Sequence, residues 1–424
     1  MNAEVKLGYK LTEVGVIPED WEVVTATEAC EFVVDCKNRT PPVLIDSDYA
    51  VVRTPNVRAG KFVLEDLRFT DKDSYREWTT RAVPQFGDIM ITREAPLGEV
   101  CAVPKGRKVC LGQRMMLYRP SPDRTDSRYL LYSLMSQPVK SNLFMKIGGS
   151  TVGHAKVDDI RFLQLPLPPI VEQEAIAEAL SDTDTLIESL EQLITKKRQI
   201  KKGAMQELLT GKKRLPGFSG EWEVKKLGDK GKCYRGVSYN PDNDLTTFDT
   251  NSTVRLLRSN NVQEGIVVFE DIQFVDSSRV TEMQKLRDND ILICMANGSK
   301  DLVGKAGRFF LDNGYIYTFG GFMGCFRPNK QTIIPDYVFY LFQTYKYRTH
   351  ISILLAGSSI NNLRPSDIEA FFVPVPPFPE QIAIVEILIE MDAEIAALEI
   401  KLKKMRQIKQ GMMHNLLTGK IRLG

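Results

Sequence analysis

The sequence predicts an α+β protein in which two similar globular domains alternate along the chain with two long helices. Three observations support this. A chain of 424 residues is too long for one ordinary hydrophobic core. The second half of the chain repeats the first. Each repeat also ends in a proline-rich stretch followed by a long segment with helical periodicity, so the predicted order is domain, helix, domain, helix.

The internal repeat is clearest when the chain is shifted by 208 residues, because 31 of the 67 positions from 149 to 215 are then identical. The segment LLTGKKRL that starts at Leu208 matches LLTGKIRL at Leu416. Upstream the match is weaker, as between GDIMIT at Gly87 and NDILIC at Asn289. The period is far longer than that of a solenoid, so each repeat is a domain with an appended helix.

The domains are predicted from short runs of strand-forming residues, such as YAVVRTPNV and NDILICM, that Gly, Asp and Asn turns separate. The segments SRYLLYSLMSQ and PDYVFYLFQTY favour short helices. We expect an N-terminal segment with the first domain at 1–165, the first helix at 166–210 and a linker at 211–221. The second domain then covers 222–373 and the second helix 374–424.

The two long helices carry an apolar residue at alternating steps of four and three, which is the pattern of a coiled-coil seam. The alternative is that each helix packs only on its own domain, but two matching seams in one chain favour pairing with each other. The predicted seam residues are Ile176, Leu180, Ile187, Leu190, Ile194, Ile384, Leu388, Met391, Ile395, Leu398, Leu402 and Met405.

Composition excludes several classes of protein. The sequence shows neither a membrane span nor a secretory signal, and its seven cysteines have no CxxC spacing, so we expect a reduced cytoplasmic protein. Basic charge is concentrated in residues 195–214 and 401–424, which each carry a net charge of +7. Because the whole chain has a net charge of +2, the remainder is acidic.

No motif predicts catalysis or a metal site. The TGK at Thr210 lacks the upstream glycine and the following Ser or Thr of a phosphate-binding loop. VPPFPE at Val375 resembles an amino-methylation motif, but its first residue cannot hydrogen-bond an amine. FGGFMG at Phe319 lacks the strand and helix of a cofactor loop. The three histidines form no zinc pattern, so we expect neither a metal nor a cofactor on this chain.

Binding is therefore the expected activity, and the polar turns of the domains are the candidate sites. Arginine reads guanine, and asparagine or glutamine reads adenine, in the DNA major groove. For any one residue, turn formation or surface solvation is the alternative. The candidate DNA-binding residues are Arg53, Asn56, Arg58, Thr92, Arg93, Gln113, Arg114, Arg258, Asn260, Asn261, Asn297, Ser299, Lys300 and Lys305.

The chain resembles the specificity subunits of type I restriction–modification enzymes over nearly its whole length. The resemblance is carried by GDIMITREAPLGEV, LGQRMMLYRP and MANGSKDLVGKAG. It is most specific in P(L/V)PPxxEQ followed by a helix that ends LLTGKxRL, which occurs twice.

This resemblance implies two target-recognition domains that each read one half of a gapped sequence in double-stranded DNA. It implies that the helices pair antiparallel, set the gap and dock two methyltransferase subunits. Those subunits would bind S-adenosylmethionine and methylate adenine. Restriction subunits would supply the ATP- and Mg-dependent reactions, so this chain would carry no catalysis.

Two other readings are open from the residues. A stand-alone or fused DNA adenine methyltransferase would need a cofactor loop and an amino-methylation motif, and the sequence shows neither. A coiled-coil scaffold without DNA specificity would not need two large domains with loops rich in Arg, Asn and Gln. The recognised sequence and the length of its gap do not follow from one chain.

Overall fold

The computed structural model describes residues 6–146, 153–310, 313–357 and 361–423. Packing divides the chain into unit 1, which comprises Met1–Gln192 and Ile400–Gly424, and unit 2, which comprises Leu193–Glu399. Each unit holds one globular domain together with part of both long helices. The units therefore do not coincide with the sequence repeats, since each includes the end of a helix that begins in the other.

Unit 1 contains an antiparallel sheet of order β10-β9-β12-β4 and a smaller, mixed sheet of order β11-β5-β8. All four residues of β9 are buried, which explains why its sequence is an apolar run rather than an alternating pattern. The strands are β1 (Tyr9–Thr12), β2 (Gly15–Pro18), β3 (Glu22–Thr25), β4 (Cys30–Asp35), β5 (Tyr49–Val52), β6 (Val57–Arg58), β7 (Lys61–Phe62), β8 (Arg68–Thr70), β9 (Ile89–Thr92), β10 (Val100–Ala102), β11 (Lys108–Leu111), β12 (Met115–Pro120) and β13 (Gln164–Leu167).

Unit 2 repeats this plan. Its sheet of order β15-β24-β21-β22 corresponds to β4-β12-β9-β10, and it is extended by the hairpin β19-β18. The strands are β14 (Glu223–Lys226), β15 (Gly231–Arg235), β16 (Leu245–Thr246), β17 (Thr253–Leu257), β18 (Val262–Gln263), β19 (Ile266–Val267), β20 (Gln273–Asp276), β21 (Ile291–Cys294), β22 (Ala306–Arg308), β23 (Tyr317–Phe319), β24 (Met323–Pro328) and β25 (Phe372–Val375).

A buried ion pair explains two motifs that occur in both repeats. In unit 1, Arg119 donates from Nε and Nη2 to Asp88, at 2.9 and 2.7 Å. In unit 2, Arg327 donates to Asp290 at the same two distances. The aspartate of GDIMIT or NDILIC thus pairs with the arginine that stands directly before the terminal proline of β12 or β24. A bidentate pair of this kind fixes the two strand ends with defined geometry.

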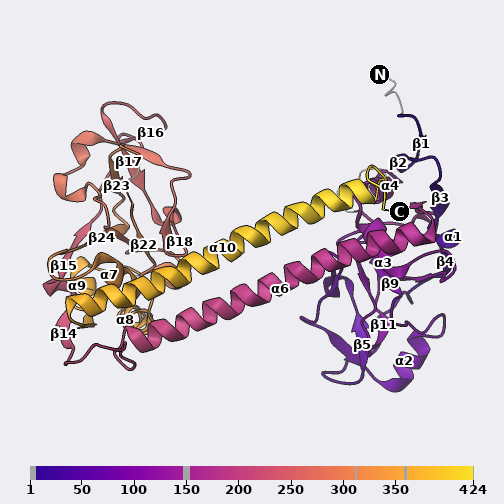
Figure 1. The fold of residues 1–424 in the computed structure, drawn as a ribbon, viewed down its shortest axis with the longest axis horizontal. Coiled ribbons are helices and arrows are strands. Elements are labelled where there is room, and N and C mark those ends of the chain that lie inside the picture. The colour runs from indigo at the N-terminus through magenta and orange to yellow at the C-terminus, as the bar shows by residue number, and fades with distance from the viewer. Residues whose placement is uncertain (1–5, 147–152, 311–312, 358–360, 424) are drawn as a thin grey trace. The chain divides into compact units, whose positions relative to one another are not determined.

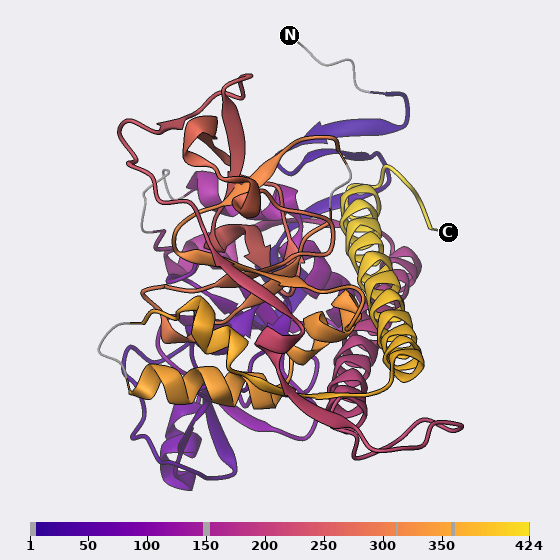
Figure 2. The same ribbon diagram turned by 90° about the vertical axis from the view of Figure 1, so that its left-hand side faces the viewer.

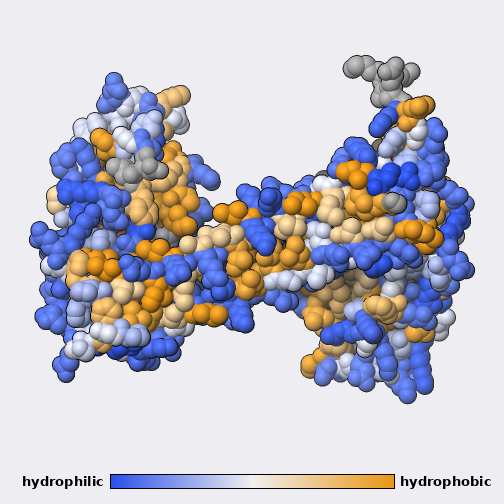
Figure 3. Space-filling view, viewed as in Figure 1, coloured by the Kyte–Doolittle hydropathy of each residue, from blue (hydrophilic) through white to orange (hydrophobic). Residues whose placement is uncertain are grey.

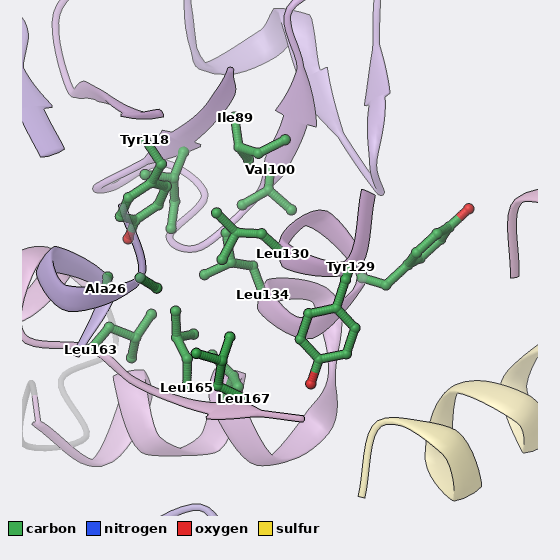
Figure 4. Close-up of a cluster of buried hydrophobic side chains, with 14 of the residues drawn as sticks. Ala26, Ile89, Val100, Tyr118, Tyr129, Leu130, Leu134, Leu163, Leu165 and Leu167 are labelled. Carbon is green, nitrogen blue, oxygen red and sulfur yellow. The ribbon is translucent and has the colours of Figure 1, made fainter. Parts of the chain in front are cut away.

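The short helices cover one face of each sheet. In Figure 4, Leu130 and Leu134 of α3 lie toward Ile89 and Val100 of the sheet, and Tyr129 points toward the strand that carries Leu165. In unit 2, α7 supplies the equivalent core residues. The short helices are α1 (Ala26–Ala29), α2 (Lys72–Trp78), α3 (Ser127–Met135), α4 (Gln137–Lys146), α5 (Val157–Arg161), α7 (Pro335–Leu341), α8 (Tyr345–Ala356) and α9 (Pro365–Glu369).

The two long helices, α6 (Ile170–Leu208) and α10 (Phe378–Leu416), have 39 residues each and run antiparallel. In unit 1, Arg406 of α10 donates to Glu191 of α6 at 2.6 Å, and in unit 2, Arg198 donates to Glu399 at 2.7 Å. Figures 1 and 2 show the helices side by side within each unit. The α+β prediction with an antiparallel helix pair is therefore confirmed.

The seam residues differ in burial along the helices. Those of α6 are all buried, whereas four of those predicted for α10 are only partly buried, namely Met391, Leu398, Leu402 and Met405. Among the described residues, no helix is long and apolar enough to cross a membrane.

Candidate nucleic-acid and partner interface

The first pair of candidate loops follows β5 in unit 1 and β17 in unit 2, and an asparagine closes each loop. The Asn56 Oδ1 accepts from the backbone N–H of Arg53 at 3.1 Å, and its Nδ2 donates to two carbonyls farther along the loop. Asn261 makes the same three bonds, the first to Arg258 N–H at 2.8 Å. Both side chains are fully buried, so their hydrogen bonds to the backbone fix the conformation of the loops.

The arginines at the start of these loops are held by carboxylates. The Arg53 Nη2 donates to the Asp66 Oδ2 at 2.8 Å, and the Arg258 Nη2 donates to the Asp271 Oδ2 at 3.0 Å. The hydrogen bond from Arg53 lowers the pKa of Asp66. Asn260 also donates to Asp271, at 3.2 Å.

The second pair of loops in unit 1 follows β9 and precedes β12. Thr92 and Arg93 are buried, and Arg93 lies 3.6 Å from a carboxylate oxygen of Asp35. Gln113 and Arg114 are exposed, and Arg114 Nε lies 2.8 Å from Glu94 Oε1. Arg114 adopts a positive φ of 69°, a left-handed backbone conformation that few non-glycine residues take up.

In unit 2 the corresponding candidates follow β21. The Asn297 Oδ1 accepts from the backbone N–H of Ser299 at 3.0 Å, which turns the chain and leaves Ser299 and Lys300 exposed. Neither Lys300 nor Lys305 forms an ion pair within the residues that the structure describes.

Burial thus sorts the fourteen candidates. Four of them, Asn56, Thr92, Arg93 and Asn261, are buried. Partial exposure is found for Arg53, Arg258, Asn297 and Lys305. The fully exposed side chains are those of Arg58, Gln113, Arg114, Asn260, Ser299 and Lys300.

A further set of contacts, which the sequence did not predict, joins the segment after one long helix to the start of the other long helix. In unit 1, Glu172 at the start of α6 accepts two bonds from Arg422, at 2.6 and 2.7 Å, and one from the Trp21 indole at 3.0 Å. Arg422 also donates to Asp20 at 2.9 and 2.7 Å. The bonds to Glu172 raise the pKa of Arg422, and the bond from Arg422 lowers the pKa of Asp20.

Unit 2 contains the matching set. Glu380 at the start of α10 is completely buried and accepts from Arg214 at 2.6 and 2.8 Å and from Trp222 at 2.9 Å. The arginine of each LLTGKxRL segment therefore binds the glutamate of PxxEQ in the other repeat. Both copies of each motif therefore take part in a joint, and their repetition was the signal available in the sequence.

The glutamine of the same motif fixes the start of each long helix to its domain. The Gln173 Oε1 accepts from the backbone N–H of Asp126, the N-cap residue of α3, at 3.0 Å. The Gln381 Oε1 accepts from the N–H of Ile334, the N-cap residue of α7, at 2.9 Å. A buried amide that is bonded on both sides leaves no unsatisfied polar atom, so this joint is stable.

A second joint lies farther along the helices. In unit 1, Tyr132 Oη and Lys409 Nζ donate to the two oxygens of Asp184, at 2.8 and 2.6 Å. In unit 2, Tyr340 Oη donates to Asp392 at 2.8 Å, and Lys201 bonds the other oxygen. Burial raises the pKa of both tyrosines above the ordinary range, so both stay protonated donors. Each network ties one domain to both helices.

The long helices also present apolar side chains to solvent. Apolar surface is visible along α10 in Figure 3. The exposed large apolar side chains on the two helices are Val171, Leu186, Leu193, Ile200, Phe378, Ile382, Ile389, Ile400 and Ile408. A helix face of this kind is suited to packing against further helices.

The described residues contain no group of three or more His, Cys, Asp or Glu side chains that could hold a metal ion. All seven cysteines are free thiols, and all are buried. Burial raises the pKa of Cys30, Cys101, Cys110 and Cys233 to about 12, so these thiols are poor nucleophiles at neutral pH.

Comparison with known proteins gives a consistent result. The model of the type I restriction modification DNA specificity domain matches residues 18–201 and again residues 219–408. The MjaVIII specificity subunit of a type I restriction enzyme from Methanocaldococcus jannaschii is 27% identical, over 96% of this chain and 94% of its own. The EcoKI specificity subunit from Escherichia coli is 30% identical over 47% of this chain and 43% of its own.

Solved structures share the fold. The S subunit of a type I restriction–modification system from M. genitalium superimposes with a TM-score of 0.56 at 16% identity, covering 98% of this chain and 99% of that chain. A second structure, from work on complex assembly and conformational transition of the type I R-M system, gives 0.58 at 17% identity and covers 96% and 99%.

Proposed function

The chain belongs to the family of type I restriction–modification DNA specificity subunits, and on that premise we propose that each domain reads one half of a bipartite target in double-stranded DNA. It is a non-catalytic subunit with two target-recognition domains. The exposed loop residues Arg58, Gln113 and Arg114 in unit 1 are the proposed base or phosphate contacts of one half-site. Asn260, Ser299 and Lys300 in unit 2 have the same role for the other.

The buried candidates take a different part in this proposal. Because the amides of Asn56 and Asn261 are saturated by the backbone, they hold the loops in shape rather than contact bases. Arg53 and Arg258 each bond one carboxylate. Their remaining guanidinium N–H groups are the proposed donors to a phosphate or guanine.

The helix pair has two roles in the proposed function. It sets the unspecified gap between the half-sites, and its exposed apolar side chains dock two methyltransferase subunits. Those subunits bind S-adenosylmethionine and methylate one adenine in each half-site. Restriction subunits that use ATP and Mg join the complex and cleave the DNA.

One observation carries the proposal: the same loop, the same closing asparagine and the same helix joints occur once in each unit. Two similar recognition surfaces in one chain are what a two-part DNA site requires.

The test is a methylation map. The chain is co-expressed with its methyltransferase subunit in a host without adenine methylation, and the DNA is sequenced with modification-sensitive long reads. We expect a two-part motif with a fixed gap, methylated on both strands. A continuous motif would overturn the two-domain reading, and absent methylation from an assembled complex would favour a scaffold.

A further inference from the structure

Unit 2 contains a cavity of about 1000 Å³ with an apolar and aromatic wall. Its sides are formed by α10, the end of α6, the β18–β19 hairpin and α7 with the segment that follows it. The apolar lining residues used below are Ile266, Phe269, Phe310, Phe339, Tyr345 and Ile389.

This wall is solvent-exposed in the chain by itself. Tyr345 is 78% exposed, Ile266 65% and Phe310 48%. Large apolar side chains that gather around a hollow are uncommon on a protein surface unless they bind something. The volume lies at the upper end of the range of about 300–1,000 Å³ that small-molecule sites occupy.

The charges around the cavity are predominantly positive. Arg198 and Lys201 are neutralised by the carboxylates of Glu399 and Asp392. Lys202, Lys212 and Lys346 are exposed and form no ion pair with any residue that the structure describes. Among the described acidic residues that line the cavity, Glu264 alone is exposed and forms no ion pair. Unpaired cations therefore outnumber unpaired anions.

The first repeat is an internal comparison. At the hairpin position of Ile266 it has Lys61, and at the helix position of Ala396 it has Glu188; these two form an ion pair at 2.8 Å in unit 1. Two of the free lysines have uncharged residues at the equivalent positions of the other repeat. Gln410 corresponds to Lys202, and Pro138 corresponds to Lys346. The cationic, apolar cavity is therefore a feature of unit 2 and not a consequence of the shared fold.

From these observations we propose that the unit 2 cavity binds a small amphiphilic anion, namely an aromatic or aliphatic body that carries one carboxylate, sulfonate or phosphate group. The aromatic wall takes the apolar body, and the free lysines take the anionic group. No step of the proposed DNA recognition uses this site. The cavity wall shares one residue, Ile389, with the helix face that is proposed to dock a methyltransferase subunit.

The test uses 8-anilinonaphthalene-1-sulfonate, whose fluorescence rises in an apolar site, titrated into the full-length chain. We expect one saturable site. The variant Ile266→Lys with Ala396→Glu transplants the ion pair of unit 1 across the cavity and is expected to weaken binding by about tenfold or more, which is a large change on the affinity scale.

A second variant tests the charge. Lys202→Gln with Lys346→Gln is expected to weaken binding of the sulfonate probe by about fivefold, the size of effect that a lost ionic contact gives. Binding of the neutral analogue N-phenyl-1-naphthylamine should not change. Lys72→Gln with Lys105→Gln makes the same change of charge in unit 1 and is the matched control. Circular dichroism melts verify that every variant is folded.

Three results would overturn the inference. The first is unchanged probe affinity in the folded Ile266→Lys/Ala396→Glu variant. The second is equal loss of both probes on removal of the lysines, since charge would then not select the ligand. The third is full displacement of the probe by the methyltransferase subunit or by duplex DNA, which would assign the cavity to that macromolecule.

Discussion

Removing one partner of the ion pair between Arg214 and the buried Glu380 is predicted to destabilise unit 2 strongly. The glutamate is 0% exposed and receives two bonds from the guanidinium and one from the Trp222 indole. Replacing Arg214 by Ala leaves a buried carboxylate with a single donor, which costs about 3 kcal/mol or more. Replacing Glu380 by Ala strands both donors at a comparable cost. The double variant removes both charges, so its loss should be smaller than the sum by about 2 kcal/mol.

The assay is urea unfolding followed by the fluorescence of Trp222, in a background with Trp21 and Trp78 changed to Phe. This isolates unit 2, because those three are all of the tryptophans. With a urea dependence of about 1–3 kcal/mol per M, each single variant should lower the midpoint by about 1 M or more. Lys213→Ala, an exposed neighbour, is the control and should change little.

A coupling energy below about 0.5 kcal/mol in this double-mutant cycle would refute the reasoning. It would mean that the glutamate is already solvated or protonated in the native protein, and that the crossed pairing is not what holds the end of α6 against the start of α10.

The remaining predictions concern recognition and chemistry. Deleting seven residues from each long helix, in facing positions, removes about 10 Å of helix and should shorten the methylated motif's gap by about 3 base pairs; an unchanged gap contradicts the spacing role. Exchanging residues 21–165 for the matching domain of a relative should change one half-site only, as read by methylation mapping. Tyr340→Phe should destabilise unit 2 by about 1 kcal/mol in thermal melts, because one bond to Asp392 is lost. All seven thiols should react slowly with a disulfide reagent in the native chain and rapidly in urea, since all are buried.

The helices and the domain plan could be predicted because their signals are local and periodic. The predicted helix at 166–210 became Ile170–Leu208, and 374–424 became Phe378–Leu416. The difference lies at the ends, where prolines precede each helix and the LTGK turn follows it. Periodicity identifies a helix but does not identify its last bonded residue.

The crossed joints could not be predicted in the same way. Arg214 and Glu380 are 166 positions apart, and Arg422 and Glu172 are 250 apart, so no local pattern relates them. Asn56 illustrates a different difficulty. An asparagine that closes a turn and one that reads adenine have the same sequence context, and only its buried, saturated amide separates them.

Comparing the two units within one chain shows which parts are shared and which are not. The joint residues are the same in both units: a tryptophan, a glutamate and an arginine meet at the end of each helix pair. The exposed candidate DNA-binding residues differ between the two units. Arg58 in the first hairpin corresponds to Gln263 in the second.

A second exposed position differs in the same way. Arg93 N–H bonds the carbonyl of Arg114, and Met295 N–H bonds the carbonyl of Phe322, so Arg114 corresponds to Phe322. A guanidinium and a phenyl ring cannot make the same contact with a base or a phosphate. The chain therefore keeps the parts that orient its domains and varies the parts that would touch DNA. On this argument the two half-sites have different sequences, and a palindromic motif in the methylation map would contradict it.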